Sequence, residues 1–452
     1  MNTRPLKLLE HLRLLLSGAG TFDGAEFYVR NVKKFLIRSK NKNIDFQRES
    51  QDFYIVLRLI KEGRLATSLG TDPSRNALSE LFQKTLDLLR FSPVESEKEI
   101  PKISFDGPIR DIDWGDENLP LVEESEKISK LFRMEDKCRN LVDKDLNFEA
   151  FYTQKYIEEA LWTLGSQDPL SEKSTYVEIG IDAQINESHK HAQAFNNDLQ
   201  THYYYLNWSQ LARRTARMLN DRLHSRAWEG GETKIFIGQK LGQKIFSALF
   251  EALRADNCLK NGSFLAGLEK SQVFSKNLTL IDDPFLNGLT GSCLWDSEGV
   301  PAQRTYFIKN GVLSSLAHNL ESAKKYGVDS TGHAFIDLEK GRHYIGCHNF
   351  FLEPSHFDDV DLLKALGSGL FLEASEKPLS FSIKTGELSI EARGYWIENG
   401  DLKHAIHGCY LRTSFQELLS KIIAVGRDLR WAHHYGAPSF VVNSIQVDAV
   451  QR

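Results

Sequence analysis

The sequence predicts an α+β fold of two domains, in which antiparallel sheets made of meanders and hairpins pack with helices. With 452 residues, the chain is too long for one ordinary hydrophobic core. Asn310-Gly311 and Asn399-Gly400 each separate apolar, alternating segments, a pattern typical of antiparallel hairpins. In the first half, amphipathic helical segments precede and follow groups of strand-like segments, and this helix–strands–helix order occurs twice.

Composition narrows the class of protein. The chain is 41% hydrophobic and 26% charged, as in soluble globular proteins, and its net charge of −5 indicates no basic face for nucleic acid. No segment has the roughly 18 consecutive apolar residues of a membrane span, and the N-terminal apolar stretch has helical spacing rather than that of a signal peptide. The five cysteines form no C-x-x-C pair, which is typical of a reduced compartment. We therefore expect a cytoplasmic protein without nucleic acid or membrane partners.

We expect the N-terminal domain to span residues 1–230. Apolar spacing predicts its first helix at 6–16, and Asp72-Pro73 begins a second helix. A connecting segment with several prolines and acids is expected at about 92–118, followed by a charged helix at about 120–142. Asn207 is expected to cap the last helix. Strands are expected at 25–30, 34–37, 44–48, 53–60, 65–70, 148–154, 156–165, 175–185 and 195–206.

We expect the second domain to span residues 231–452, because Glu229-Gly230-Gly231-Glu232 has the composition of a boundary. Helices are expected at about 239–254, 316–327, 360–366 and 415–425, and Gly327 and Gly367 are expected to end the middle two. Strands or hairpins are expected at 234–238, 277–281, 304–313, 370–373, 381–383, 388–392, 394–400 and 439–447.

An acidic loop at 282–301 follows one of these strands. It contains four carboxylates, of Asp282, Asp283, Asp296 and Glu298, together with Gly299. Paired carboxylates can perform general acid–base chemistry, but they can also accept backbone N–H bonds and fix tight turns. We favour the second interpretation, because no base, nucleophile or metal cluster lies near them in the sequence. We expect the loop to shape the wall of a cleft.

Histidine is absent where a zinc protease helix would need it. Such a helix carries two histidines one turn apart and a glutamate that deprotonates the bound water. The chain has no His-Glu pair, and no histidine lies between His224 and His318. Candidates for a different metal site are His343, Cys347, His348, His404, His407 and Cys409. Because alternation along a strand places His404 and His407 on opposite faces, we favour ordinary hydrogen-bonded histidines and expect no metal in this chain.

Cys293 is the thiol whose setting best suits a nucleophile, since it follows Ser292 in a loop flanked by glycine. A nucleophilic thiol needs a nearby histidine and a lowered pKa, and the sequence indicates neither. We therefore expect no catalytic residue in this chain.

A series of motifs occurs in the order and spacing of one family. They are Ala25-Glu26-Phe27-Tyr28-Val29, the small-residue loop 262–267, Leu280-Ile281-Asp282-Asp283-Pro284, Asp296-x-Glu298-Gly299-Val300-Pro301, Ile308-x-Asn310-Gly311-Val312-Leu313, Ser330-Thr331-Gly332, Thr385-Gly386 with Gly394-x-Trp396-Ile397-Glu398-Asn399-Gly400, and Val425-Gly426-x-Asp428-Leu429. By these motifs the chain resembles the TldD/PmbA family, once called modulators of DNA gyrase, and looks most like its PmbA (TldE) branch.

The resemblance implies a two-domain α+β fold and a role in the proteolysis of unfolded or flexible peptides. In the TldD branch, the helix before the 262–267 loop carries His-Glu-x-x-x-His, and a late Cys completes a zinc site. This chain has Phe-Ser-Ala-Leu-Phe-Glu at 246–251 and Tyr-Gly-Ala-Pro-Ser at 435–439. The resemblance therefore implies a non-catalytic subunit, with zinc expected in a TldD-like partner subunit. Candidates for shaping the cleft or contacting the peptide are Asp282, Asp283, Asp296, Glu298, Gly299, Thr385 and Gly386.

Two alternatives to this function remain. The first is a stand-alone metal-dependent hydrolase built from the six His and Cys candidates. The second is a regulatory adaptor, which the older family name suggests. Whether the isolated chain forms a homodimer stays open.

Overall fold

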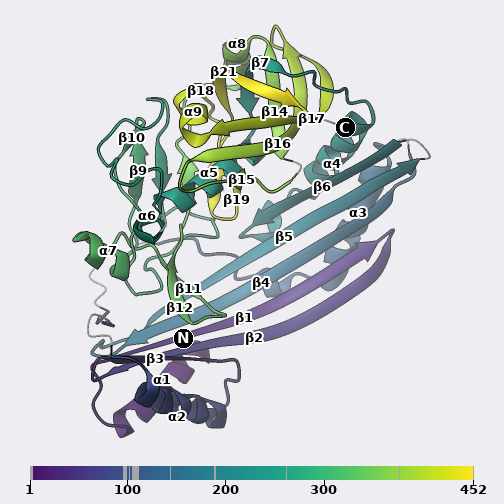
Figure 1. Cartoon of the computed structure of the whole chain (residues 1–452). Coiled ribbons are helices and arrows are strands. Elements are labelled where there is room, and N and C mark those ends of the chain that lie inside the picture. Colours follow the sequence, from purple (N-terminus) through teal and green to yellow (C-terminus); the bar gives the residue numbers. More distant parts are fainter. Residues whose placement is uncertain are drawn as a thin grey trace.

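The structure is a computed structural model, and it describes residues 4–94, 99–100, 102–103, 111–142, 144–187, 190–260, 262–375 and 377–450. Helices pack against largely antiparallel sheets, which confirms the predicted α+β class (Figure 1). Of the segment expected to connect elements at about 92–118, residues 95–98, 101 and 104–110 lie outside the described residues, and the rest of it forms no helix or named strand. No helix in the described ranges is long and apolar enough to cross a membrane.

The first half of the chain builds one six-stranded antiparallel sheet, called here the long sheet, in the order β3-β2-β1-β4-β5-β6. Its strands are β1 (Gly24–Lys40), β2 (Asn43–Lys61), β3 (Arg64–Gly70), β4 (Asn147–Thr163), β5 (Leu170–Glu187) and β6 (Lys190–Gln200). These strands are longer than the sequence predicts, because β1 and β4 each run unbroken through a pair of segments expected as separate strands. β2 and β3 are joined by a turn at Glu62-Gly63, and both of its residues have positive φ, as a tight hairpin requires.

Helices cover the two ends of the long sheet (Figure 1). At one end are α1 (Arg4–Gly18) and α2 (Arg75–Phe91), whose leucines pack with those of β2 in one core. At the other end are α3 (Glu124–Arg139) and α4 (Trp208–Leu223), preceded by the short 3-10 helices η1 (Leu119–Leu121) and η2 (Tyr203–Tyr205). The predicted cap of α4 is confirmed, because the Asn207 side chain accepts a hydrogen bond from the Gln210 backbone N–H.

The expected strand at 195–206 is wrong over its second half. β6 ends at Gln200, and Tyr203 begins the 3-10 helix η2. The backbone N–H of Tyr203 donates to the Asp116 carboxylate, and its ring packs against Tyr152 and Trp208. These contacts bury Tyr203 in the core, whereas Tyr204 and Tyr205 stay exposed, and they override the strand propensity of three consecutive tyrosines.

Residues 231–450, called here the C-terminal unit, contain two larger sheets and one hairpin. The first sheet has the order β14-β7-β21-β17-β16-β15, and β14 also pairs with β16, so that the strand order closes on itself. Its strands are β7 (Gly231–Ile237), β14 (Gly369–Ser375), β15 (Ser380–Phe381), β16 (Glu387–Glu398), β17 (Asp401–Ser414), β18 (Ile422–Val425, beside β21) and β21 (Phe440–Ala449). The pairing of β7 with β14 is parallel, whereas the other pairs in this sheet are antiparallel.

The second sheet of the C-terminal unit has the order β10-β9-β8-β13-β20-β19. Its strands are short: β8 (Leu280–Asp282), β9 (Thr305–Lys309), β10 (Val312–Leu313), β13 (Phe350–Leu352), β19 (Arg430–Ala432) and β20 (Tyr435–Ala437). The helix α5 (Gln239–Leu253) packs against both sheets and buries its apolar face in the largest core. A hairpin of β11 (Ala334–Asp337) and β12 (Arg342–Ile345) reaches down to the long sheet, where Gly341 lies against Thr67 and Leu69 (Figure 1).

The short helices of the C-terminal unit are α6 (Ala255–Lys260), α7 (Leu320–Tyr326), α8 (Asp359–Leu366) and α9 (Phe415–Ser420). The predicted C-terminal cap of α7 is confirmed, since Gly327 adopts the left-handed conformation with φ of 67°. The helix expected at 415–425 is wrong after Ser420. There the chain pairs with β21 as strand β18, which satisfies the backbone groups of an apolar segment that would otherwise be left unpaired.

The long sheet and the C-terminal unit meet through a small apolar cluster. Tyr28, Val56 and Leu161 from the long sheet pack with Trp295 of the acidic loop and Ile336 of β11. The acidic loop is thus held between the second sheet of the C-terminal unit and the face of the long sheet.

Candidate metal centre

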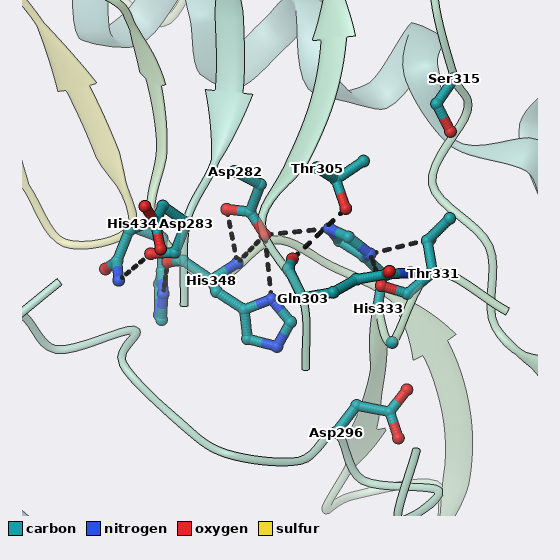
Figure 2. Close-up of polar contacts among 12 residues, drawn as sticks. Asp282, Asp283, Asp296, Gln303, Thr305, Ser315, Thr331, His333, His348 and His434 are labelled. Carbon is teal, nitrogen blue, oxygen red and sulfur yellow. Dashed lines mark hydrogen bonds and ion pairs between the residues drawn. The ribbon is translucent and has the colours of Figure 1, made fainter. Parts of the chain in front are cut away.

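Asp282, the last residue of β8, is completely buried and lies between two histidines. Its Oδ2 atom is 2.9 Å from Nε2 of His333 and 2.9 Å from Nδ1 of His348. The pairing of β8 with both β9 and β13 fixes the position of this carboxylate. His333 is also completely buried, and His348 is only 2% exposed. Figure 2 shows both rings directed at the carboxylate.

The orientation of His333 is fixed by Thr331. The Nδ1 atom of His333 is 2.8 Å from the Thr331 carbonyl oxygen and 2.8 Å from its hydroxyl. Thr331 is itself anchored, because its hydroxyl accepts a hydrogen bond from the His318 backbone N–H. Since Nδ1 donates to the carbonyl, the opposite nitrogen, Nε2, points to Asp282 (Figure 2).

His348 contacts Asp282 through both its backbone and its side chain. Its backbone N–H lies 3.1 Å from each carboxylate oxygen, and its Nδ1 completes the contact. Its carbonyl oxygen accepts a hydrogen bond from His434. The remaining ring nitrogen, Nε2, is buried and has no hydrogen-bond partner among the described residues. A buried ring nitrogen without a hydrogen-bond partner costs free energy.

The three groups form a charge network. Burial alone would raise the pKa of Asp282, but hydrogen bonds from His333 and His348 outweigh burial and lower that pKa well below its usual value. Burial lowers the pKa of His348, although the Asp282 charge opposes this effect. The centre therefore combines an ionised carboxylate with imidazole nitrogens, a donor set that can hold a proton or a metal cation.

The other carboxylates of the acidic loop fix turns. Asp296 accepts hydrogen bonds from the backbone N–H groups of Glu298, Val300 and Ala334. Asp283 accepts one from the Phe285 backbone within its own turn. Glu298 accepts one from the Leu320 backbone at the start of α7. These contacts are the turn-fixing interactions that the sequence analysis favours over acid–base chemistry.

Asp296 and Glu298 are buried close together. Burial and the Asp296 charge raise the pKa of Glu298 to about 8. Burial raises the pKa of Asp296 to about 6, against three backbone hydrogen bonds that lower it. Because both carboxylates face into the protein, they show no open position for a substrate in this structure, and a role in peptide contact stays a prediction.

The three remaining cleft candidates lie in two places. Gly299 has φ of 77° and faces Ile103, where a Cβ would be 2.5 Å from the Ile103 side chain. Thr385 and Gly386 form the turn between β15 and β16, and Gly386 packs against the ring of Phe264. Gly299 therefore belongs to the contact with the N-terminal half of the chain, whereas Thr385 and Gly386 belong to the closed sheet.

The six His and Cys residues proposed as an alternative metal site do not form one cluster. His343 contacts Arg58 and Glu26 of the long sheet, Cys347 contacts Tyr435, and His348 alone joins the Asp282 centre. His404 and Cys409 lie on β17, where Cys409 is completely buried. His407 also lies on β17, but its side chain is outside the described part of the structure. Cys347 and His348 are neighbours in sequence but face different surroundings, so they do not contribute to one site.

Cys293 does not have the setting of a nucleophile. It belongs to the acidic loop and is partly buried, and burial raises the pKa of its thiol well above the usual value, with the charges of Glu172 and Asp282 adding to the effect. A thiol that stays protonated is a poor nucleophile.

Sequence reasoning missed His333. It lies 51 positions from Asp282, and His348 lies 66 positions from Asp282, so no local pattern joins the three. The signal was present in two sequence motifs: His333 directly follows Ser330-Thr331-Gly332, and Asp282 lies within the Asp-Asp-Pro motif. Polar residues in or beside separate motifs can thus indicate a buried centre.

The fold and its motifs define a class, that of proteins related to metallopeptidases. Residues 230–449 match the family model described as the PmbA/TldA metallopeptidase C-terminal domain. The chain belongs to the PmbA/TldD family. It is 24% identical over 422 residues to metalloprotease PmbA of Escherichia coli O157:H7, covering 91% of this chain and 89% of that protein. It is 26% identical over 237 residues to a metalloprotease PmbA homolog of Buchnera aphidicola, and this match spans about half of each chain (52% and 51%).

Solved structures share the fold over the whole chain. TldE from Thermococcus kodakarensis has a TM-score of 0.87 at 19% identity, with 98% of this chain and 100% of that chain covered. A Bacteroides thetaiotaomicron protein, named as a candidate modulator of DNA gyrase, has a TM-score of 0.89 at 17% identity, with both chains fully covered (100%). At such low identities these similarities establish the fold alone.

The helix at which the TldD branch carries its zinc motif is α5, and its residues here do not fit a zinc site. Phe246 and Phe250 are buried in the largest core, and Phe250 packs edge-on against Phe307 and Phe350. Glu251, the one carboxylate of α5, accepts a hydrogen bond from Arg254. Aromatic rings thus occupy the buried face of α5, and no imidazole is available there to bind a metal.

Proposed function

We propose that this chain is the non-catalytic, PmbA (TldE)-like subunit of a heteromeric TldD-type zinc protease that acts on unfolded or flexible peptides. In this proposal the catalytic zinc belongs to a TldD-like partner subunit, and this chain completes the cleft that binds the peptide. The proposal rests on one observation above others, the aromatic core that replaces the zinc motif of α5.

The geometry of α5 supports the proposal in physical terms. A zinc protease needs two imidazoles and a carboxylate on the same helix, next to space for water and substrate. Here the equivalent face of α5 is closed by Phe246 and Phe250, which are 0% and 1% exposed. Restoring a metal site would require charged or polar groups in a packed core, which is strongly unfavourable.

The Asp282 centre also supports a non-catalytic chain. Its three residues are at most 2% exposed, so a peptide carbonyl cannot reach them in this conformation. The stand-alone hydrolase therefore has no accessible metal site among the residues that the structure describes. Peptide contact by the candidates with an exposed side chain, such as Thr385, remains part of the proposal.

The test is to purify the chain alone and together with the TldD-like subunit of the same organism, and to assay both with an unstructured peptide. We expect no cleavage by the chain alone, cleavage by the mixture, and loss of that cleavage when a chelator is added. A partner in which the first histidine of the zinc motif is replaced by alanine should abolish activity. Cleavage by the chain alone that a chelator stops would contradict the proposal.

A matched variant of this chain tests whether α5 contributes to the chemistry. Glu251→Gln removes the one carboxylate of α5 at a partly exposed position, where the side chain can still accept a hydrogen bond from Arg254. The complex with this variant should retain the kcat of the unmodified complex. A drop of 100-fold or more, on the order expected for loss of a general base, would show that α5 takes part in catalysis.

A further inference from the structure

The Asp282 centre has a donor arrangement that the proposed function does not use. Three side chains from separate segments place one ligand atom each within 4.8 Å of the others. We propose that Asp282, His333 and His348 bind one zinc ion that stabilises the C-terminal unit. This departs from the expectation that the chain holds no metal of its own, and the ion would be structural, since the centre is closed to substrate.

The hydrogen bonds around His333 are those of a metal ligand. The Thr331 carbonyl oxygen can only accept, so Nδ1 of His333 carries the proton and donates to it across 2.8 Å. With that proton on Nδ1, Nε2 can donate to the Asp282 carboxylate, 2.9 Å away, only when the ring is doubly protonated. A metal ion would take the place of this second proton and bind the Nε2 lone pair. A metal-bound histidine commonly donates its other N–H to a backbone carbonyl, which fixes both tautomer and ring orientation.

The single oxygen Oδ2 of Asp282 faces two imidazole nitrogens at 2.9 Å each. In a tetrahedral zinc site with bonds of about 2.0–2.1 Å, neighbouring ligand atoms are about 3.3 Å apart. Each oxygen–nitrogen pair therefore needs to lengthen by only a few tenths of an ångström to admit the ion, and the two nitrogens lie within 4.8 Å of each other. They leave a fourth position, which a water molecule or the second oxygen of Asp282 can fill.

Charge balance favours a cation at the centre. Asp282 is completely buried, and within the described ranges neither lysine nor arginine forms an ion pair with it. The guanidinium of Arg304 pairs with the neighbouring Asp283, at 3.5 Å. A buried carboxylate without a cationic partner is strongly destabilising. A divalent ion between the carboxylate and two neutral imidazoles removes this cost.

The chemistry of the donors selects zinc over magnesium or calcium. Magnesium and calcium prefer sites made of oxygen ligands, whereas two imidazoles with one carboxylate form a common zinc set. When the Nδ1 atom of His348 binds the ion, its buried Nε2 atom carries the ring proton and faces away from the ion. The adjacent thiol of Cys347 is not among the ligands, because it contacts Tyr435 instead.

The experiment uses the tag-free full chain, purified without chelator. We expect elemental analysis to find about one equivalent of zinc. After removal of zinc by dialysis, Co²⁺ should restore one equivalent and give the visible absorption of a tetrahedral site, without the near-ultraviolet bands of a thiolate ligand. Less than about a tenth of an equivalent, both as purified and after incubation with excess Zn²⁺, would overturn the proposal, because a structural zinc site binds tightly.

Variants assign the ligands. His333→Gln should lower zinc affinity at least 100-fold and remove the rise in melting temperature that zinc gives the metal-free protein. Two matched controls, His343→Gln and Cys347→Ser, each replace a nearby buried residue of a type that can bind zinc. Both proteins should still bind one equivalent of zinc. If His333→Gln does not fold, the cobalt spectrum of the unmodified protein decides the question. Unchanged zinc affinity in a folded His333→Gln protein would exclude this site.

The zinc measurement is separate from the proposed function, because it needs neither partner nor peptide. Bound zinc together with no cleavage by the isolated chain is the outcome that both proposals predict. Bound zinc with chelator-sensitive cleavage by the isolated chain would overturn the proposed function and the structural role, but not the ligand assignment.

Discussion

Asp296 shows how one carboxylate can organise a loop. Its Oδ1 atom accepts hydrogen bonds from the backbone of Glu298 and Val300, and its Oδ2 accepts one from Ala334. In Asp296→Asn, one carboxylate oxygen becomes an NH₂ group that must face a backbone donor. We expect the free energy of unfolding to fall by about 1–3 kcal/mol, measured by urea denaturation.

The control for this prediction is Asp401→Asn, at a side chain that is 78% exposed and pairs with Lys403 only across 3.6 Å. A surface change of this kind should alter stability by less than about 0.5 kcal/mol. Equal effects of the two variants would show that the three backbone contacts of Asp296 are not important.

We expect the buried ring of His343 to make the stability of the protein depend on pH. Its Nδ1 accepts a hydrogen bond from Arg58, and its Nε2 donates to the Ser297 carbonyl, so the folded ring is neutral. Glu26 and Glu298 also face the ring, at 3.6 and 3.5 Å. Burial lowers the pKa of His343 to about 4, although the charge of Glu26 opposes the shift. The ring therefore stays neutral in the folded state under conditions in which it is protonated in the unfolded state.

Between the unfolded pKa of about 6.5 and the folded pKa of about 4, the unfolded state binds one more proton at this residue. Stability is therefore present above about pH 6.5 and is lost as pH falls through this window, by at most about 3 kcal/mol. Urea denaturation of the unmodified protein and of His343→Gln at several pH values checks this. The variant should lose part of the acid dependence, and an identical slope for both proteins would refute the assignment.

The pH dependence of the unmodified protein must be compared with that of His343→Gln, because the titration of Glu298 changes stability with pH in the opposite direction. Its pKa is raised to about 8 by burial and by Asp296, so the folded state binds the extra proton between the usual value and about 8. The contribution of Glu298 to stability is thus lost as pH rises. Comparison with His343→Gln isolates the histidine from this effect.

At the scale of elements, the acidic loop packs directly against the segment that carries His348. A Cβ atom at Gly291 would be 1.9 Å from the His348 carbonyl oxygen and 2.5 Å from its carbonyl carbon. Because these are backbone atoms, the collision cannot be relieved by rotating a side chain. We expect Gly291→Ala to lower the free energy of unfolding by about 2–3 kcal/mol, as measured by chemical denaturation.

Gly18→Ala is the matched control, since a Cβ at Gly18, the last residue of α1, meets no atom within 4 Å. The same substitution there should leave stability within about 0.5 kcal/mol of the unmodified protein. A Gly291→Ala protein as stable as the Gly18→Ala protein would mean that the loop and the His348 segment are not in firm contact.

Individual elements were predictable where the signal is local. The turns at Glu62-Gly63 and Asn310-Gly311 have positive φ at both residues, as their residue types indicate, and Gly327 ends α7 as expected. The elements that the sequence mispredicted are those whose ends depend on distant partners. β18 exists because Ile422 and Val425 pair with β21, and η2 replaces a strand because Asp116 binds the Tyr203 backbone.

At the scale of the whole molecule, the apolar contact around Trp295 joins the long sheet to the C-terminal unit. Trp295 is 7% exposed and packs with Tyr28, Val56 and Leu161. We expect Trp295→Ala to cost about 3–5 kcal/mol. Because the lost contacts join the two halves, scanning calorimetry should show one broad or divided transition in place of a single sharp one.

Trp431→Ala is the control for this prediction. Trp431 packs against Phe351 within the C-terminal unit, away from the Trp295 cluster. Its truncation should lower the melting temperature without dividing the transition. A single sharp transition in Trp295→Ala would show that other contacts, such as those of Arg58 with His343, are sufficient to couple the halves.

The sequence by itself determined the α+β class, the family, and most helices and hairpin turns. Each of these depends on residue types at short spacing, which fix backbone conformation locally. Only the tertiary structure decided which titratable groups meet. It joined Asp282 to His333 and His348, and it separated His348 from Cys347. The physical reason is that the buried centre joins side chains that lie 51 and 66 positions apart in the sequence, and residue patterns at short spacing carry no information about such contacts.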